Sequence, residues 1–322
     1  MPDTETPRQE VWDQLLDENW TERRKVLDWK GLPYVHHHVA LLTGGDEPDS
    51  ASHWYDYLRD RYLLPYLERP SQERQRGISL LSLGCGSGSI ERNLFNFKWP
   101  IQSIHCCEAS EALLEACRRN LVDLPSDIIQ RFTRFDMNDT RCADLGQYDV
   151  IFFCHALHHC HEIEDMIEFL HRSLVPGGLV LGIDYFGPAR LQVSLRTKVV
   201  LDKLLDLLPD RLKVDLSGER PRASDSFLPP GFRSIMLGDP SEASRSSDIR
   251  DLLFTSFDIC DEKPMGGTLL RHVLWNRAGN YQSEGDMEIL KLLCFIEREF
   301  ITSRLLESDD LLFALRSPTV RP

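Results

Sequence analysis

The sequence predicts a doubly wound α/β fold, in which helices cover both faces of a mostly parallel sheet. Short apolar runs alternate with helical patterns between residues 78 and 184. The first run, 78–83, leads directly into the glycine-rich turn Gly84-Cys85-Gly86-Ser87-Gly88. A later run, 148–154, is apolar enough to be a strand that is buried on both faces. Together these observations indicate a ligand-binding turn at the end of the first strand.

The elements follow one another in order along the chain. In the core we expect strands over 78–83, 102–107, 128–135, 148–154 and 179–184, and helices over 89–97, 110–121 and 162–173. The residues Val175-Pro176-Gly177-Gly178 predict a tight turn before the fifth strand. Outside the core we expect helices over 8–30, 53–68, 191–208 and 284–304, loops over 216–248, and strands over 254–260 and 311–315.

We divide the 322 residues into four segments. A helical N-terminal cap is expected over 1–70 and a ligand-binding core over 71–186. A cap insertion follows over 187–250, and the strands and helices of 251–322 complete the core. One core domain with additions suits a chain of this length.

The composition of the chain indicates which binding partners and which cellular compartment to expect. The formal net charge of -14 repels phosphate backbones, so we expect no nucleic-acid partner. Nine cysteines without a disulfide-framework spacing indicate reduced thiols and a cytoplasmic location. We find no signal-peptide pattern and no apolar stretch long enough to span a membrane. A monomer and a homodimer both remain open.

The glycine turn favours S-adenosylmethionine over a dinucleotide. Ser89 stands where the dinucleotide fingerprint requires its third glycine, and S-adenosylmethionine has no pyrophosphate for the helix N-terminus to bind. Glu108 ends the second strand 20 residues after Gly88, where a carboxylate can accept hydrogen bonds from ribose hydroxyls. Asp136 ends the third strand, where its carboxylate can accept a hydrogen bond from the adenine amine, and Asp139 is close enough to be an alternative. Met137 can pack on the adenine ring.

These motifs, followed by Leu157-His158-His159 and Leu174-Val175-Pro176-Gly177-Gly178, resemble the class I S-adenosylmethionine-dependent methyltransferase family. The segments 184–192, 238–246 and 266–270 are similar to a bacterial subfamily with an added C-terminal cap region. The resemblance implies a seven-stranded Rossmann-like sheet of order 3-2-1-4-5-7-6, with S-adenosylmethionine as cofactor. The implied cofactor-binding residues are Gly84, Cys85, Gly86, Ser87, Gly88, Glu108, Ala109, Asp136, Met137 and His155.

One position departs from the family pattern. Ser82 stands where the family usually has an acid near the methionine part of the cofactor. Backbone carbonyls around Gly84 offer an alternative acceptor for the amino group of the ligand.

The stretch from Cys154 to His161 allows three interpretations. Its dense histidines and cysteines are compatible with a metal site, but a metal needs three or four converging ligands, and we predict none. The histidines could also be structural. We favour catalysis, in which His155 or His158 orients the acceptor or takes its proton, because imidazole titrates near neutral pH. Tyr185, after the fifth strand, is a third catalytic candidate.

The acceptor is expected to be a small molecule from a specialised biosynthetic pathway. The candidate acceptor-binding residues are Tyr34, His38, His159, Tyr185, Arg190, Gln192 and Arg245, each with a purely structural alternative. An exposed turn is the alternative for the triplet that contains His38. A carrier-bound, protein or tRNA acceptor and a non-catalytic cofactor-binding paralogue are the other hypotheses. An NAD-dependent oxidoreductase is disfavoured by Ser89.

Overall fold

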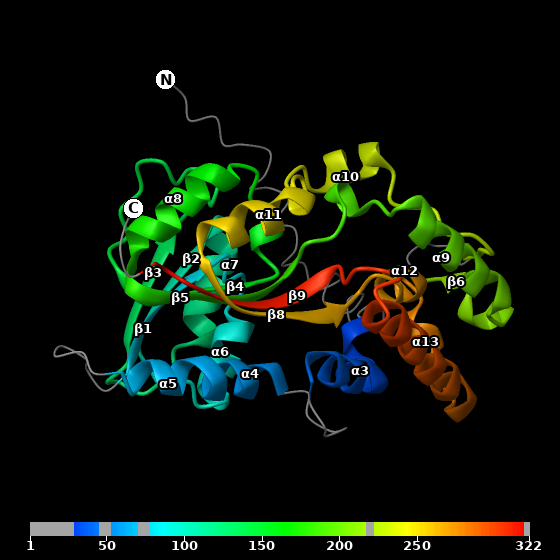
Figure 1. The fold of residues 1–322 in the computed structure, drawn as a ribbon, viewed down its shortest axis with the longest axis horizontal. Coiled ribbons are helices and arrows are strands. Elements are labelled where there is room, and N and C mark those ends of the chain that lie inside the picture. Colours follow the sequence, from blue (N-terminus) through cyan, green and yellow to red (C-terminus); the bar gives the residue numbers. More distant parts are fainter. Residues whose placement is uncertain (1–28, 45–52, 70–76, 217–221, 319–322) are drawn as a thin grey trace.

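The computed structural model describes residues 29–44, 53–69, 77–216 and 222–318. These residues contain a seven-stranded sheet of order β3-β2-β1-β4-β5-β9-β8 (Figure 1). The strands are β1 (Ile78–Leu83), β2 (Ile101–Glu108), β3 (Ile129–Arg134), β4 (Tyr148–Cys154), β5 (Leu174–Tyr185), β8 (Asp258–Gly266) and β9 (Asp310–Arg316).

The topology of this sheet confirms the prediction. The pairs β3-β2, β2-β1, β1-β4 and β4-β5 are parallel, whereas β9 runs antiparallel to both β5 and β8. Numbered within the sheet alone, the order is 3-2-1-4-5-7-6. Two very short strands, β6 (Val214–Asp215) and β7 (Arg222–Ala223), pair separately from it.

Helices cover both faces, which explains the apolar runs. Leu80 and Phe152 are buried in one core cluster, while their chain neighbours Leu81 and Phe153 are buried in the other. Successive side chains of a strand point to opposite faces, so both faces must be apolar. The first face carries α4 (His53–Leu58), α5 (Leu64–Leu67), α6 (Ser89–Asn96) and α7 (Glu111–Asn120), and the second carries α8 (Ile163–Ser173) and α11 (Ser246–Ser256) (Figure 1).

Helices form a cap beside the end of β8 and the start of β9 (Figure 1), and a third apolar cluster holds the cap together. It joins side chains from α3 (Pro33–Thr43), α9 (Leu195–Leu207), α12 (Leu270–Leu274) and α13 (Glu284–Thr302). In the C-terminal segment, β8 and β9 therefore join the sheet, whereas α12 and α13 join the cap. None of the helices in the described ranges has the length and apolarity needed to cross a bilayer.

Some element boundaries differ from the prediction. The strand expected over 254–260 begins at Asp258, because Ile249, Leu253 and Phe254 bury one face of α11 at helical spacing. The expected turn before the fifth strand is part of β5, with a register shift between Tyr148 and Val150.

Two further expectations concern segments outside the core. The histidine triplet expected in a turn lies within α3, and the expected loop segment contains α10 (Phe232–Gly238). Of the helix expected over 8–30, residues 8–28 lie outside the described residues, and Trp29–Gly31 form a 3₁₀ turn.

Candidate active site

The glycine turn after β1 has the backbone geometry that its sequence requires. Gly84, Gly86 and Gly88 have φ angles of 69°, 53° and 78°, in the left-handed region that favours glycine. The amide of Gly84 donates to the carbonyl of Cys107 at 2.8 Å, which ties the turn to the end of β2. A Cβ atom on Gly84 would lie 2.5 Å from the Cβ of Ala156, whereas one on Gly86 would meet no atom within 4 Å.

The variant Gly84→Ala should lower the free energy of unfolding by more than Gly146→Ala does. Both glycines have positive φ angles, so an alanine costs roughly 1–2 kcal/mol of backbone strain at either position. Only at Gly84 does the new methyl group also collide with a neighbour, Ala156. Urea unfolding of the two variants measures the difference. Equal losses would show that the loop relaxes away from β4.

Glu108 stands beside this turn at the end of β2. Its Oε2 accepts a hydrogen bond from the amide of Gly86 at 2.9 Å, and its Oε1 accepts one from the amide of Ser110 at 3.1 Å. Burial raises the pKa of Glu108 above its usual value, although these two amides act in the opposite direction. The structure therefore brings the glycine turn and the predicted ribose-binding carboxylate together.

The other predicted cofactor contacts border the same turn. The Met137 side chain approaches Gly84, because its Cε would lie 3.4 Å from a Cβ there. Asp136 is exposed and accepts hydrogen bonds from the amide and the side chain of Asn138 at 2.8 and 3.2 Å. The carbonyl of Ser87 accepts from Asn120, and that of Ala109 accepts from Arg134.

Cys85 turns its side chain away from the open side of the loop. Its thiol is buried in a group with those of Cys106 and Cys117, whose sulfur atoms lie within 4.8 Å of one another. Only the backbone of Cys85 is therefore left to face a ligand.

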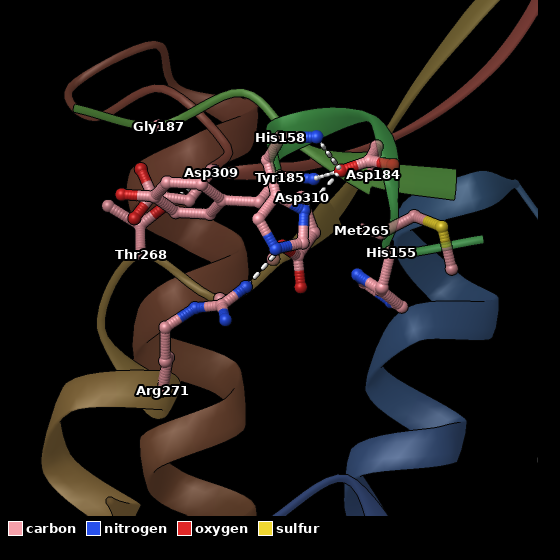
Figure 2. Close-up of polar contacts among 12 residues, drawn as sticks. His155, His158, Asp184, Tyr185, Gly187, Met265, Thr268, Arg271, Asp309 and Asp310 are labelled. Carbon is pink, nitrogen blue, oxygen red and sulfur yellow. Dashed lines mark hydrogen bonds and ion pairs between the residues drawn. The ribbon is translucent and has the colours of Figure 1, made fainter. Parts of the chain in front are cut away.

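His158 and Asp184 form a buried pair at the ends of β4 and β5 (Figure 2). The Asp184 carboxylate lies 2.6 Å from Nδ1 of His158. It also accepts the amides of Ala156, Leu157 and Tyr185 at 2.9, 2.7 and 2.8 Å. Burial acts to raise the pKa of Asp184, but the His158 ring and these donors outweigh it, so the pKa lies below the usual value.

The electrostatics of His158 suit a proton acceptor. Burial acts to lower its pKa, yet the charge of Asp184 outweighs burial and holds the pKa above the usual 6.5. The other ring nitrogen, Nε2, lies 3.6 Å from Oε1 of Glu242. Because Nδ1 faces a carboxylate, it carries the hydrogen in the neutral ring, and Nε2 is the basic nitrogen.

His155 differs from His158 in charge and backbone. Its φ angle of 51° is unusual for a residue with a side chain, and its Nε2 lies 2.7 Å from Nζ of Lys30. Burial, and then the positive charge of Lys30, lower the pKa of His155 to about 3. Its imidazole is therefore neutral at pH 7 and a poor base.

Acidic and basic side chains from distant segments gather beside these histidines. Lys30 lies 3.4 Å from Oδ2 of Asp310, whose other oxygen contacts the Arg271 guanidinium. The guanidinium also lies 4.9 Å from the centre of the Tyr185 ring. Tyr185 is fully buried, and its hydroxyl donates to the carbonyl of Pro188 at 2.9 Å.

Arg190 and Gln192, predicted to bind the acceptor, both contact backbone carbonyls. Arg190 donates to the carbonyls of Pro240 and Glu242 at 2.5 and 3.2 Å, and Gln192 donates to that of Pro230 at 3.1 Å. These contacts hold the segment 230–242 against the end of β5.

Arg245 and His159 fasten the same loop to the core. Arg245 makes a two-point contact with the Glu164 carboxylate at 2.8 and 2.9 Å. Nδ1 of His159 lies 3.0 Å from Oγ of Ser241. These four predicted acceptor ligands thus have structural partners in the protein as described.

Tyr34 and His38 lie on α3 and face α13. Nε2 of His38 is 2.8 Å from Oε1 of Glu297, and both side chains are buried. The Tyr34 ring lies 4.5 Å from Nζ of Lys291. The structure thus places both residues in the packing of the cap.

One mixed group has the spacing of metal ligands. His158, His159 and Glu242 each offer a ligand atom within 4.8 Å of the others. The expectation that the protein uses no metal remains a prediction.

The comparison that decides the family covers this same region. Residues 81–180, which include the glycine turn, Glu108 and His158, match the family model of a methyltransferase domain. Residues 81–180 of this chain form a methyltransferase domain. The methyltransferase domain thus spans β1 to β5, where the sequence motifs lie.

The chain has distant relatives. It is 26% identical over 137 residues to the demethylmenaquinone methyltransferase of Leptospira interrogans, a match that covers 42% of this chain and 55% of that protein. The chain therefore spans little more than half the length of this curated relative. The cyclopropane synthase MmaA2 from Mycobacterium tuberculosis shares the fold, with a TM-score of 0.51, 15% identity and coverage of 98% of this chain and 100% of that chain.

The residues of the methyltransferase domain fit S-adenosylmethionine, the cofactor of this family. Gly86 leaves open space beside the turn, so a ligand can approach the backbone closely. Glu108 supplies the carboxylate that a ribose requires. Residues 84–88, Glu108 and Met137 would hold the nucleoside part.

Several residues of the site escaped the sequence analysis. Asp184 is the last residue but one of β5, and an acid at that edge of a parallel sheet was a usable signal. Glu242 lies in the segment 238–246 that resembles the bacterial subfamily, but that resemblance implied no role for it. Lys30, Arg271 and Asp310 come from segments far apart in the chain, and no motif marks them.

Proposed function

We propose that this protein transfers a methyl group from S-adenosylmethionine to a small-molecule acceptor by direct displacement. The observation that carries the proposal is the glycine turn with Glu108 hydrogen-bonded to the Gly86 amide. The cofactor, when bound, supplies an activated methyl group. The protein aligns the reactants and excludes water, which accounts for much of the rate in such a transfer.

His158 is the proposed general base. Asp184 fixes the orientation and the tautomer of the His158 ring. Nε2 is therefore directed away from the Asp184 carboxylate and can take a proton from the methyl acceptor. His155 was an equal candidate from the sequence, but its low pKa makes it a weak base. We assign His155 a positioning role beside Lys30.

Three observations favour a small acceptor. His158 and Tyr185 are buried, which disfavours an acceptor that is part of a bulky surface. The net charge of -14 disfavours RNA. The name of the Leptospira relative gives demethylmenaquinone, a small molecule, as its acceptor. We place the reaction in a biosynthetic pathway in the cytoplasm.

The variant Glu108→Ala should weaken the binding of S-adenosylhomocysteine by roughly 5- to 150-fold, or about 1–3 kcal/mol. Calorimetric titration measures this, with NADH as the negative ligand. Glu111→Ala, an exposed acid on the neighbouring helix, is the matched control. Unchanged affinity in Glu108→Ala would remove the ribose assignment.

A further inference from the structure

A buried acid that the mechanism does not use lies on α6, the helix that follows the glycine turn. Glu91 is on α6, only 2% exposed, and its Oε1 accepts a hydrogen bond from Oγ of Ser82 at 2.6 Å. Its other oxygen, Oε2, is buried and has no hydrogen-bond partner in the described part of the chain. An unsatisfied buried carboxyl oxygen is costly, so it indicates a partner that the protein alone does not supply.

The position of Glu91 links it to the cofactor site. Ser82 precedes Gly84 by two residues on β1, and α6 begins at Ser89, directly after the turn. The carboxyl group of Glu91 is thus held between the strand and the helix that the turn connects. It also interacts electrostatically with Tyr55 on α4.

The surroundings of Glu91 contain acids and thiols. Its electrostatic neighbours include Glu108 and Cys117. The charge of Glu91 also acts to raise the pKa values of three thiols, those of Cys85, Cys106 and Cys154. Burial, only partly offset by Ser82 and by the backbone amide of Glu91 itself, raises the pKa of Glu91 to about 8. A cation that enters this environment would be stabilised, whereas a second anion would be repelled.

We propose that Glu91 receives the α-ammonium group of the amino-acid part of S-adenosylmethionine, so that α6 supplies the acid that position 82 lacks. The inference rests on the proposed function, because it concerns the same cofactor. Ser82 then acts as a positioning residue, since its hydroxyl holds Oε1 and leaves Oε2 for the ligand. No covalent bond changes in this step.

Binding should release a proton. At pH 6.5 Glu91 is mostly protonated in the free protein, since its pKa is about 8. An ammonium group beside the carboxyl lowers that pKa, and the displaced proton passes to solvent. The affinity should therefore rise with pH up to about 8 and then level off. The pKa of Glu108 is raised as well, so Glu108 can also contribute to the pH dependence of the affinity. The contribution of Glu91 is the part of that pH dependence that disappears in a Glu91 variant.

The experiment is a calorimetric titration at pH 6.5 in two buffers of different ionisation enthalpy. The ligands are S-adenosylhomocysteine and its desamino analogue, in which hydrogen replaces the amino group. Wild-type protein should prefer S-adenosylhomocysteine by about tenfold or more, since charged hydrogen bonds are the strong ones. Glu91→Gln should reduce this preference to less than about threefold and abolish most of the proton release. Glu115→Gln, an exposed acid on α7, is the control.

A second variant keeps the test valid if Glu91→Gln fails to fold. The double variant Ser82→Asp with Glu91→Ser moves the acid onto β1 and should restore the preference. Equal affinity of wild-type protein for the two ligands, or an unchanged preference in Glu91→Gln, would overturn the inference and leave the proposed function intact. Failure of wild-type protein to bind S-adenosylhomocysteine would overturn both.

Discussion

His158→Asn should lower turnover by about 10²- to 10⁴-fold while leaving the affinity for S-adenosylhomocysteine unchanged. The asparagine amide can still donate a hydrogen bond to Asp184, so the buried carboxylate keeps a partner at that position. The ring nitrogen that would accept the proton is lost. Steady-state methyl transfer from labelled cofactor, together with calorimetry, separates the two effects.

The pH dependence of the wild-type enzyme tests the same assignment. A base acts only when it is deprotonated, and Asp184 holds the pKa of His158 above 6.5. We therefore expect kcat/KM to rise as the pH passes through a value above 6.5. This rise should be absent from the pH profile of the residual activity of His158→Asn.

His161→Asn is the matched control for this pair of measurements, because His161 lies in the same stretch but is not placed against Asp184. Its turnover and its pH profile should equal those of wild-type protein. If His158→Asn kept half of the wild-type turnover, proton transfer would have to be assigned elsewhere, or the acceptor would need none.

Glu297→Ala should lower the free energy of unfolding by about 3–5 kcal/mol, the cost of breaking a buried charged network. Glu297 is fully enclosed on α13 and accepts hydrogen bonds from His38 at 2.8 Å and from the amides of Gly267, Leu269 and Leu270 at 3.1, 2.6 and 2.8 Å. Alanine would leave all these donors unsatisfied in a dry environment. Chemical unfolding followed by circular dichroism measures the loss.

Glu299→Ala, two residues along the same helix and exposed, should change stability by less than about 0.5 kcal/mol. Burial acts to raise the pKa of Glu297, but its donors outweigh burial and hold the pKa below the usual value. The stabilisation by Glu297 is therefore present at neutral pH and is lost as the pH falls through the lowered pKa. A similar loss in both variants would show that α13 itself, rather than the Glu297 network, responds to the substitution.

Local patterns predicted the strands of the core well, because each strand is an apolar run within a short segment, whereas the order of the strands followed from the family resemblance. The strand from Tyr148 to Cys154 has the bounds expected from its apolar run. The glycine turn and Glu108 meet because adjacent parallel strands end at the same edge. The start of β8 was misjudged, since Phe254 packs equally well from a helix or a strand.

The acceptor side of the site could not be predicted in the same way. Arg190 suited an anionic acceptor by residue type, but its guanidinium binds backbone carbonyls that only the folded loop brings near. Lys30 and Asp310 meet across almost the whole chain, which no periodicity encodes. Ser82 marked a missing acid, yet the pairing with Glu91 depends on how α6 packs against β1.

The position of β9 makes the order of synthesis matter. This strand lies between β5 and β8, although β8 precedes it in the chain. A nascent chain that has emerged only as far as β8 cannot pair that strand with β5, and Asp310, the partner of Lys30, has not yet been made. Until β9 emerges, β5 and β8 both present open strand edges. That interval is when the growing chain is most exposed to edge-to-edge aggregation on the ribosome.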